Sequence, residues 1–232
     1  MLQYLTVPAK VKQTASMILV HGLGDSGYGW KPVAELLSAK LPHVKFILPH
    51  APIQPVSLNN GMPMPSWFDI SSLTLEGTED EEGLLKSSSE LNKLITQEVE
   101  NGVPSHRIVI GGFSQGGSLS FLVGLSSERK LAGLVSLSGW MSLRSKMKSM
   151  LGPHHQHLPI FQAHGLDDPM VQFKYAQRTN EFTKELGFKD TTKENPKPHS
   201  ISFNTYDGIG HGACKEELDD LFEFLNKVIP NQ

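Results

Sequence analysis

Short apolar runs alternate along the chain with longer segments whose apolar residues recur at helical spacing. The runs lie at 17–21, 45–48, 107–110, 132–138 and 158–164, with an edge strand expected near 3–7 and a last strand at 199–206. Compact apolar runs of this kind are typical of strands buried on both faces of a parallel sheet. Helical spacing appears at about 30–40, 79–101, 118–125, 171–186 and 215–228. The alternation predicts an α/β fold, with a mostly parallel central sheet and helices on both faces.

Residues 49–78 form the longest stretch without a regular pattern, and prolines stand at positions 49, 52, 55, 63 and 65. We interpret the stretch as a long loop, which in a compact domain is uncommon unless it is functional. Its sparse apolar residues, Leu73 and Leu75 among them, either cap a hydrophobic groove or pack under the loop. The acidic run at 79–82 begins the next helix, where negative charge interacts favourably with the helix dipole.

Ser114 lies in the sequence Gly-Phe-Ser-Gln-Gly at 112–116, between an apolar strand and an apolar helix. This is the G-x-S-x-G pattern of a nucleophile elbow in the context that it requires. A strand that turns at once into a helix would crowd any Cβ at Gly112 or Gly116. We therefore expect Ser114 Oγ at the carboxyl edge of the sheet. The N–H of Gln115, at the helix start, can donate to an oxyanion.

Two further strand ends supply the groups that a nucleophilic serine needs. The acid is one of the neighbours Asp167 and Asp168, and the base is His211, which glycines bracket between the last strand and the last helix. The order serine, acid, histidine is that of α/β-hydrolases. The histidine removes the serine proton, and the acid fixes the imidazole tautomer. His21 precedes the serine and opens a glycine loop, where such enzymes place a second oxyanion donor, here the N–H of Leu23.

Composition and charge narrow the class of protein. The chain has 21 Lys and Arg against 24 Asp and Glu, a net charge of −3 with no basic block, so nucleic-acid binding is not predicted. Cys214 is the only cysteine, and no signal peptide or long apolar run is recognised, which favours a cytoplasmic location. The histidines at 154, 155 and 157 lack accompanying metal ligands, so we expect no metal and no cofactor. With 232 residues and no visible linker, a single domain over 1–232 is predicted.

Several motifs occur together in one order: His-Gly-Leu-Gly-Asp-Ser-Gly at 21–27, Pro-His-Ala-Pro at 49–52, Ser-Trp-Phe-Asp at 66–69, Gly-Gly-Phe-Ser-Gln-Gly-Gly at 111–117, Ser-Leu-Ser-Gly at 136–139, and then His211. This set, over about residues 14–228, closely resembles the acyl-protein thioesterases, also described as lysophospholipase-like carboxylesterases. The resemblance implies an α/β-hydrolase fold and a cytosolic serine hydrolase that removes long acyl chains, such as palmitate, from cysteine thioesters on proteins. Lysophospholipids and simple esters are implied as side substrates.

The resemblance also implies roles for individual residues. Ser114 is the nucleophile, His211 the histidine and Asp168, directly before a proline, the acid; Leu23 and Gln115 supply the oxyanion donors. Where the family often has an aspartate after His-Gly, this chain has Leu166, so Asp167 stays the alternative acid.

The acyl chain needs an apolar groove. The candidates to line it are Leu73, Leu75, Trp140, Met170 and Val171. Leu2 stands where some relatives carry a lipid-modified cysteine, so we expect transient contact with a membrane surface and no stable anchor.

Two other interpretations stay open. A carboxylesterase or lysophospholipase acting on lipid or small esters would need the same triad, because thioester and oxyester hydrolysis use the same machinery. A non-catalytic protein of this fold that binds a hydrophobic ligand or a partner fits less well, because such proteins usually lack a triad member and every expected position is filled here.

Overall fold

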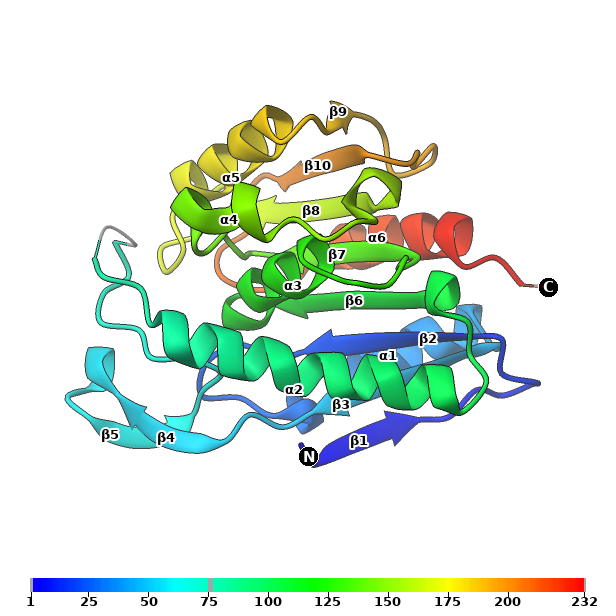
Figure 1. Ribbon diagram of the computed structural model, residues 1–232, viewed down its shortest axis with the longest axis horizontal. Helices are drawn as coiled ribbons and strands as arrows, with labels where there is room; N and C mark the ends of the chain where they lie inside the picture. The colour runs from blue at the N-terminus through cyan, green and yellow to red at the C-terminus, as the bar shows by residue number, and fades with distance from the viewer. Residues whose placement is uncertain (1, 75–76, 232) are drawn as a thin grey trace.

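The fold is organised around an eight-stranded sheet (Figure 1). The computed structural model describes residues 2–74 and 77–231 of the chain. The strand order is β1-β3-β2-β6-β7-β8-β10-β9. The strands are β1 (Tyr4–Val7), β2 (Ala15–Val20), β3 (Val44–Pro49), β6 (Ile108–Phe113), β7 (Gly133–Leu137), β8 (Pro159–Gly165), β9 (Lys189–Asp190) and β10 (Ser200–Tyr206). Only β1 pairs antiparallel with its neighbour within this sheet. The predicted mostly parallel sheet is therefore confirmed.

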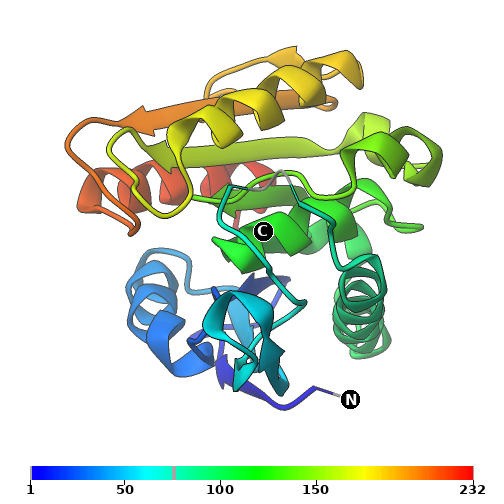
Figure 2. The same cartoon turned by 90° about the vertical axis from the view of Figure 1, so that its left-hand side faces the viewer.

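Helices cover both faces of the sheet (Figures 1 and 2). One face carries α1 (Gly27–Lys40) and α6 (Lys215–Val228), and the other carries α2 (Glu81–Glu100), α3 (Gln115–Leu125), α4 (Arg144–Met150) and α5 (Phe173–Glu185). Each layer has its own core: Leu37 and Phe224 belong to the first, and Leu91 and Leu119 to the second. The helix α3 is buried along its whole length, in agreement with its apolar sequence.

The helix ends follow ordinary capping chemistry. Helix α1 begins three residues before the predicted start, because Ser26 Oγ accepts the N–H of Tyr28 as its cap. The acidic run was correctly assigned to a helix start: Asp80 caps α2 by accepting the N–H of Gly83. The short α4 was not predicted, and Met147 is its buried residue. Among the residues that the structure describes, no helix is long and apolar enough to cross a membrane.

The prediction of an unbroken loop over 49–78 is wrong, because part of that stretch is a β-hairpin. Its strands β4 (Ile53–Val56) and β5 (Met62–Pro65) pair antiparallel, with Pro55 opposite Pro63. The prolines are tolerated because a two-stranded ribbon leaves one edge of each strand unpaired. The turn includes a 3₁₀ helix, η1 (Ser57–Asn59), and then Asn60 and Gly61, both with positive φ. Asn-Gly is a hairpin signal that would have revealed the turn.

Parallel strands bring their carboxyl ends to one edge of the sheet. In Figure 1 the arrowheads of β2, β6, β8 and β10 lie at the left, on the side of the hairpin, and Figure 2 looks onto this edge. The functional groups predicted from the sequence follow these strands directly.

Candidate active site

Ser114 occupies a strained turn between β6 and α3. Its backbone has φ 54° and ψ −118°, and its N–H donates to the carbonyl of Leu137 on the neighbouring strand. Glycine is required on both sides of Ser114 because other backbone segments pass very close to these positions. A Cβ on Gly112 would lie 2.5 Å from the Gly116 carbonyl, and one on Gly116 would lie 2.2 Å from the carbonyl oxygen of Val20. The sharp turn aims the serine side chain out of the sheet edge, as the elbow pattern predicts.

A chain of hydrogen bonds joins Ser114, His211 and Asp168. His211 Nε2 lies 2.9 Å from Ser114 Oγ, and His211 Nδ1 lies 2.7 Å from Asp168 Oδ2. The other carboxylate oxygen, Asp168 Oδ1, accepts the backbone N–H groups of Met170 and Val171, each at 2.9 Å. The structure thus brings together the three residues that the resemblance assigned to the triad.

The structure places the two aspartates in different surroundings. Asp167 is exposed, and its backbone N–H donates to Ile209, whereas the buried Asp168 faces His211. Burial raises the pKa of Asp168, but the hydrogen bonds from His211, Val171 and Met170 outweigh it and hold the pKa below its ordinary value. An ionised carboxylate therefore lies behind the histidine at neutral pH.

The two residues predicted to supply oxyanion donors lie in the turn of Ser114 itself and in the loop after β2. Gln115 is the first residue of α3, where helix N–H groups have no partner within the helix. Leu23 follows β2 and lines the same groove as Ser114. The loop packs tightly on the nucleophile, since a Cβ on Gly22 would lie 3.3 Å from Ser114 Cβ. The structure therefore places both predicted donor residues close to the nucleophile, on two different segments of the chain.

An apolar groove of about 200 Å³ opens onto Ser114 and His211. Of the predicted lining residues, Leu73, Trp140, Met170 and Val171 are present, and Leu75 lies outside the described residues. Ile70, a loop residue that with Leu73 was expected either to cap a groove or to pack under the loop, also lines it, whereas Trp30, Leu58 and Phe113 were not predicted to do so. Leu58 belongs to the unpredicted hairpin turn, and the Asn60-Gly61 signal beside it would have pointed to that turn.

His164 is a further residue that the sequence analysis did not single out. It is fully buried at the end of β8, where Nε2 lies 2.7 Å from the Val171 carbonyl and 3.5 Å from Asp168 Oδ2. Both of these oxygen atoms can only accept a hydrogen bond, so Nε2 carries a proton. Burial lowers the pKa of this imidazole and keeps it neutral. In the sequence, only its position at a strand end, four residues before Asp168, could have pointed to it.

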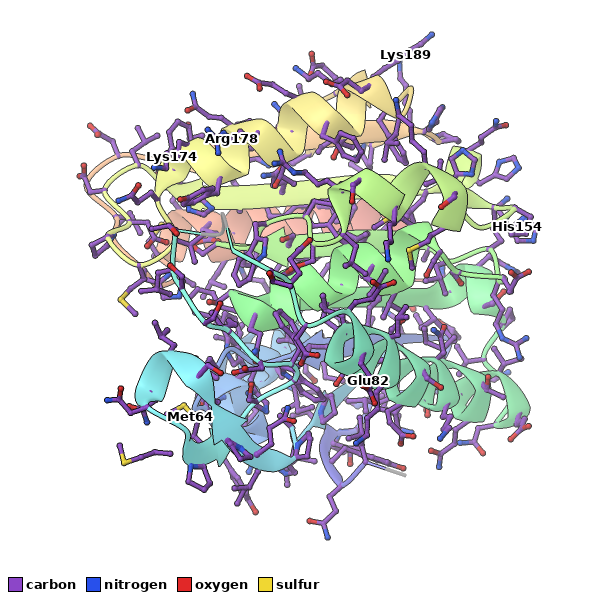
Figure 3. The ribbon with its side chains drawn as sticks, turned by 60° about the vertical axis from the view of Figure 1, so that its left-hand side comes forward. Met64, Glu82, His154, Lys174, Arg178 and Lys189 are labelled. Atoms are coloured by element: carbon purple, nitrogen blue, oxygen red, sulfur yellow. The ribbon has the colours of Figure 1, made fainter. Side chains whose placement is uncertain are left out.

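The histidines near 155 lie away from the site. Figure 3 shows His154 on the opposite side of the molecule from Met64, which belongs to the hairpin beside the groove. Lys174 and Arg178 stand on α5 in the same view.

Comparison with known proteins places this geometry in a family. The model of the phospholipase/carboxylesterase family matches residues 3–229. Acyl-protein thioesterase 1 of Mycosarcoma maydis is 50% identical, with 96% of this chain and 94% of that protein covered. Acyl-protein thioesterase 1 of Cryptococcus neoformans is 45% identical, with 98% of each covered. The crystal structure of acyl-protein thioesterase 2 from Zea mays is 27% identical and superposes with a TM-score of 0.85, covering 98% of this chain and 99% of that one. The chain belongs to the acyl-protein thioesterases, within the phospholipase/carboxylesterase family of α/β-hydrolases.

Proposed function

We propose that this protein is a serine hydrolase that removes long-chain, palmitoyl-type acyl groups from S-acylated cysteines of proteins. The observation that carries the proposal is the apolar groove that opens onto Ser114, with His211 hydrogen-bonded behind the serine. The relatives from Mycosarcoma maydis and Cryptococcus neoformans, which bear the name of this activity, support it.

In the first half-reaction Ser114 Oγ attacks the thioester carbonyl carbon while His211 Nε2 takes its proton, which the 2.9 Å contact permits. The carbonyl oxygen becomes an oxyanion, held by the N–H groups of Leu23 and Gln115. Asp168 stabilises the imidazolium through its 2.7 Å contact with Nδ1. Collapse of the tetrahedral intermediate breaks the C–S bond, and His211 returns the proton to the departing cysteine thiol.

In the second half-reaction water replaces the thiol. His211 removes a proton from the water, whose oxygen attacks the acyl-Ser114 ester, and the same N–H groups hold the second oxyanion. Cleavage of the ester bond releases the fatty acid, and the proton returns to Ser114 Oγ. Both half-reactions use only side chains and backbone N–H groups of this chain and water, so we propose that the enzyme works without metal or cofactor.

The groove provides a physical basis for chain-length preference. Leu73, Trp140, Met170 and Val171 offer apolar surface next to the nucleophile. Each buried methylene contributes roughly 0.8 kcal/mol, which corresponds to about four-fold in kcat/KM if it is expressed in the transition state. Long chains are then strongly favoured over acetyl groups.

A carboxylesterase or lysophospholipase acting on lipid or small esters is the second candidate, favoured by the phospholipase/carboxylesterase family match. For either substrate we propose one domain over residues 1–232 acting in the cytoplasm, where a single cysteine, Cys214, fits reducing conditions. Contact with a membrane surface would be transient and would last only while a membrane-bound substrate is engaged.

The test is acyl release from S-acylated cysteine peptides with chains from acetyl to stearoyl, using Ser114→Ala as the blank. Release that depends on Ser114 and rises with chain length is expected. Activity confined to the shortest chains, or a much higher kcat/KM on lysophosphatidylcholine than on an S-palmitoyl peptide, would reject the thioesterase and favour the second candidate.

A further inference from the structure

Residues 65–68 (Pro-Ser-Trp-Phe) connect the hairpin to the groove, and the mechanism above gives them no role. They include part of the Ser-Trp-Phe-Asp motif. Ser66, Trp67 and Phe68 are all buried, with Trp67 only 1% exposed. Ser87 on α2 donates its hydroxyl proton to the Trp67 carbonyl, which ties the segment to a long helix. A buried, anchored segment beside an active site can hold other groups in place.

On one side the segment holds the loop that carries Leu23. The indole Nε1–H of Trp67 donates to the carbonyl of His21 at 2.8 Å, and the N–H of Gly24 donates to the carbonyl of Pro65 at 2.8 Å. These bonds lie immediately before and after residues 22 and 23. The segment therefore fixes the loop at both ends of the stretch that presents the Leu23 N–H.

His21 strengthens this attachment from inside the loop. Its Nδ1 lies 2.7 Å from the carbonyl of Gly22, and its Nε2 accepts the N–H of Ala51 at 3.1 Å. The carbonyl can only accept and the amide can only donate, so the imidazole is neutral with its proton on Nδ1. Burial lowers the pKa of His21 and favours the same state. The Trp67 and His21 rings also pack together, with centroids 5.1 Å apart.

On the other side the segment holds the side chain of Gln115, which is completely buried. The backbone N–H of Trp67 donates to Gln115 Oε1 at 2.9 Å. Gln115 Nε2 donates to the Phe68 carbonyl at 2.7 Å and to Ser66 Oγ at 3.0 Å. The segment therefore holds both the oxygen and the nitrogen of the Gln115 side-chain amide. It thereby fixes the residue whose backbone N–H is the other proposed oxyanion donor.

We propose that residues 65–68, with Trp67 at their centre, are a positioning brace that sets the spacing of the two oxyanion donors. The proposal rests on the proposed catalytic roles of Leu23 and Gln115. The donors follow different strands, β2 and β6, yet both must lie about 2.7–3.1 Å from one oxygen atom. A displacement of about 1 Å in such a site can cost roughly 100-fold in rate. Trp67 acts through the donors and touches no reacting atom.

The decisive variants are Trp67→Phe and Gln115→Met. The first removes the indole N–H but keeps an aromatic ring; the second removes the amide contacts but keeps the backbone N–H. Each should lower kcat for p-nitrophenyl acetate about 10- to 100-fold with little change in KM. A substrate this short leaves most of the groove empty, so the result does not depend on acyl-chain preference.

An oxyanion mimic separates positioning from general damage. An alkyl trifluoromethyl ketone forms a hemiketal with Ser114 whose oxyanion needs both donors, whereas the corresponding secondary alcohol forms none. In both variants the affinity for the ketone should fall by the same factor as kcat/KM, while the affinity for the alcohol stays unchanged. The stability control is Phe224→Leu, in the core on the other face of the sheet, which should lower the melting temperature without changing kcat.

Unchanged kcat in folded Trp67→Phe and Gln115→Met would overturn the brace. A change that appears only in KM would also overturn it. So would a fall in kcat that Phe224→Leu reproduces when it lowers the stability by the same amount. If Trp67→Phe does not fold, Gln115→Met decides alone. Wild-type protein that hydrolyses the acetate ester but not S-palmitoyl peptides would reject the proposed function and leave the brace intact.

Discussion

Replacement of Asp168 by Asn tests the triad most sharply, because the surrounding turn dictates how the amide must lie. The oxygen at the Oδ1 position accepts two N–H groups, from Met170 and Val171, so an Asn carbonyl oxygen is held there. The amide NH₂ then replaces Oδ2, which lies 2.7 Å from His211 Nδ1. Two donors would face each other unless His211 moves its proton to Nε2. In that tautomer Nε2 cannot accept the proton of Ser114.

We therefore expect Asp168→Asn to lower kcat about 10⁴-fold, equivalent to roughly 5 kcal/mol of transition-state stabilisation. The measurement is steady-state hydrolysis of a p-nitrophenyl ester, with circular dichroism to establish folding. Asp167→Asn is the matched control: this carboxylate is exposed, His211 Nδ1 is hydrogen-bonded to Asp168, and the change should stay within about two-fold. A larger loss in Asp167→Asn than in Asp168→Asn would refute both the acid assignment and the tautomer argument.

Three further changes probe other parts of the structure. Burial raises the pKa of Glu217 to about 7, so its ionisation should cost stability as the pH rises from about 4.5 through 7. Glu217→Gln should then be about 3 kcal/mol more stable than wild type at pH 8 and no more stable at pH 4, by calorimetry; equal differences at both pH values would contradict this. Gly116→Ala places a Cβ 2.2 Å from the Val20 carbonyl oxygen and should cost about 1–3 kcal/mol in urea unfolding and slow acylation by a fluorophosphonate. A normal acylation rate would show that the elbow tolerates the methyl group. His164→Leu removes the N–H beside Asp168 and should lower kcat about 10-fold, with partial recovery in His164→Gln. Wild-type kcat in His164→Leu would show that this imidazole has no influence on the acid.

The elbow was predictable because its requirements are local. The glycines at 112 and 116 and the strand and helix around Ser114 are all visible within one short window of sequence. The choice between Asp167 and Asp168 was harder, because neighbouring residues in a turn point in different directions and composition does not reveal which. In the structure Asp168 Oδ1 closes its own turn by accepting two N–H groups, and Oδ2 faces His211 Nδ1.

The hairpin and much of the groove could not be read from periodicity. Prolines 55 and 63 argue against a strand inside a large sheet, but they are harmless in an isolated ribbon, and only Asn60-Gly61 signalled the turn. Groove residues such as Trp30 and Leu58 come from separate elements that meet only after folding. The contacts of Trp67 and Gln115 join residues 48 positions apart through side-chain hydrogen bonds, for which a single sequence has no periodic signal.

The strand order explains why the two proposed oxyanion donors would need support from a third segment. The chain leaves β2 for β3 on one side, and then returns to β6 on the other, so β2 lies between them. The connecting helices α1 and α2 cover opposite faces, and a crevice forms at such a reversal. Leu23 follows β2 and Gln115 follows β6, so the two proposed donors come from the two strands at this reversal. The pairing of β2 with β6 ends at Val20 and Gly112, before Leu23 and Gln115, so the strand ladder does not itself hold these two residues, and residues 65–68 supply hydrogen bonds to both sides.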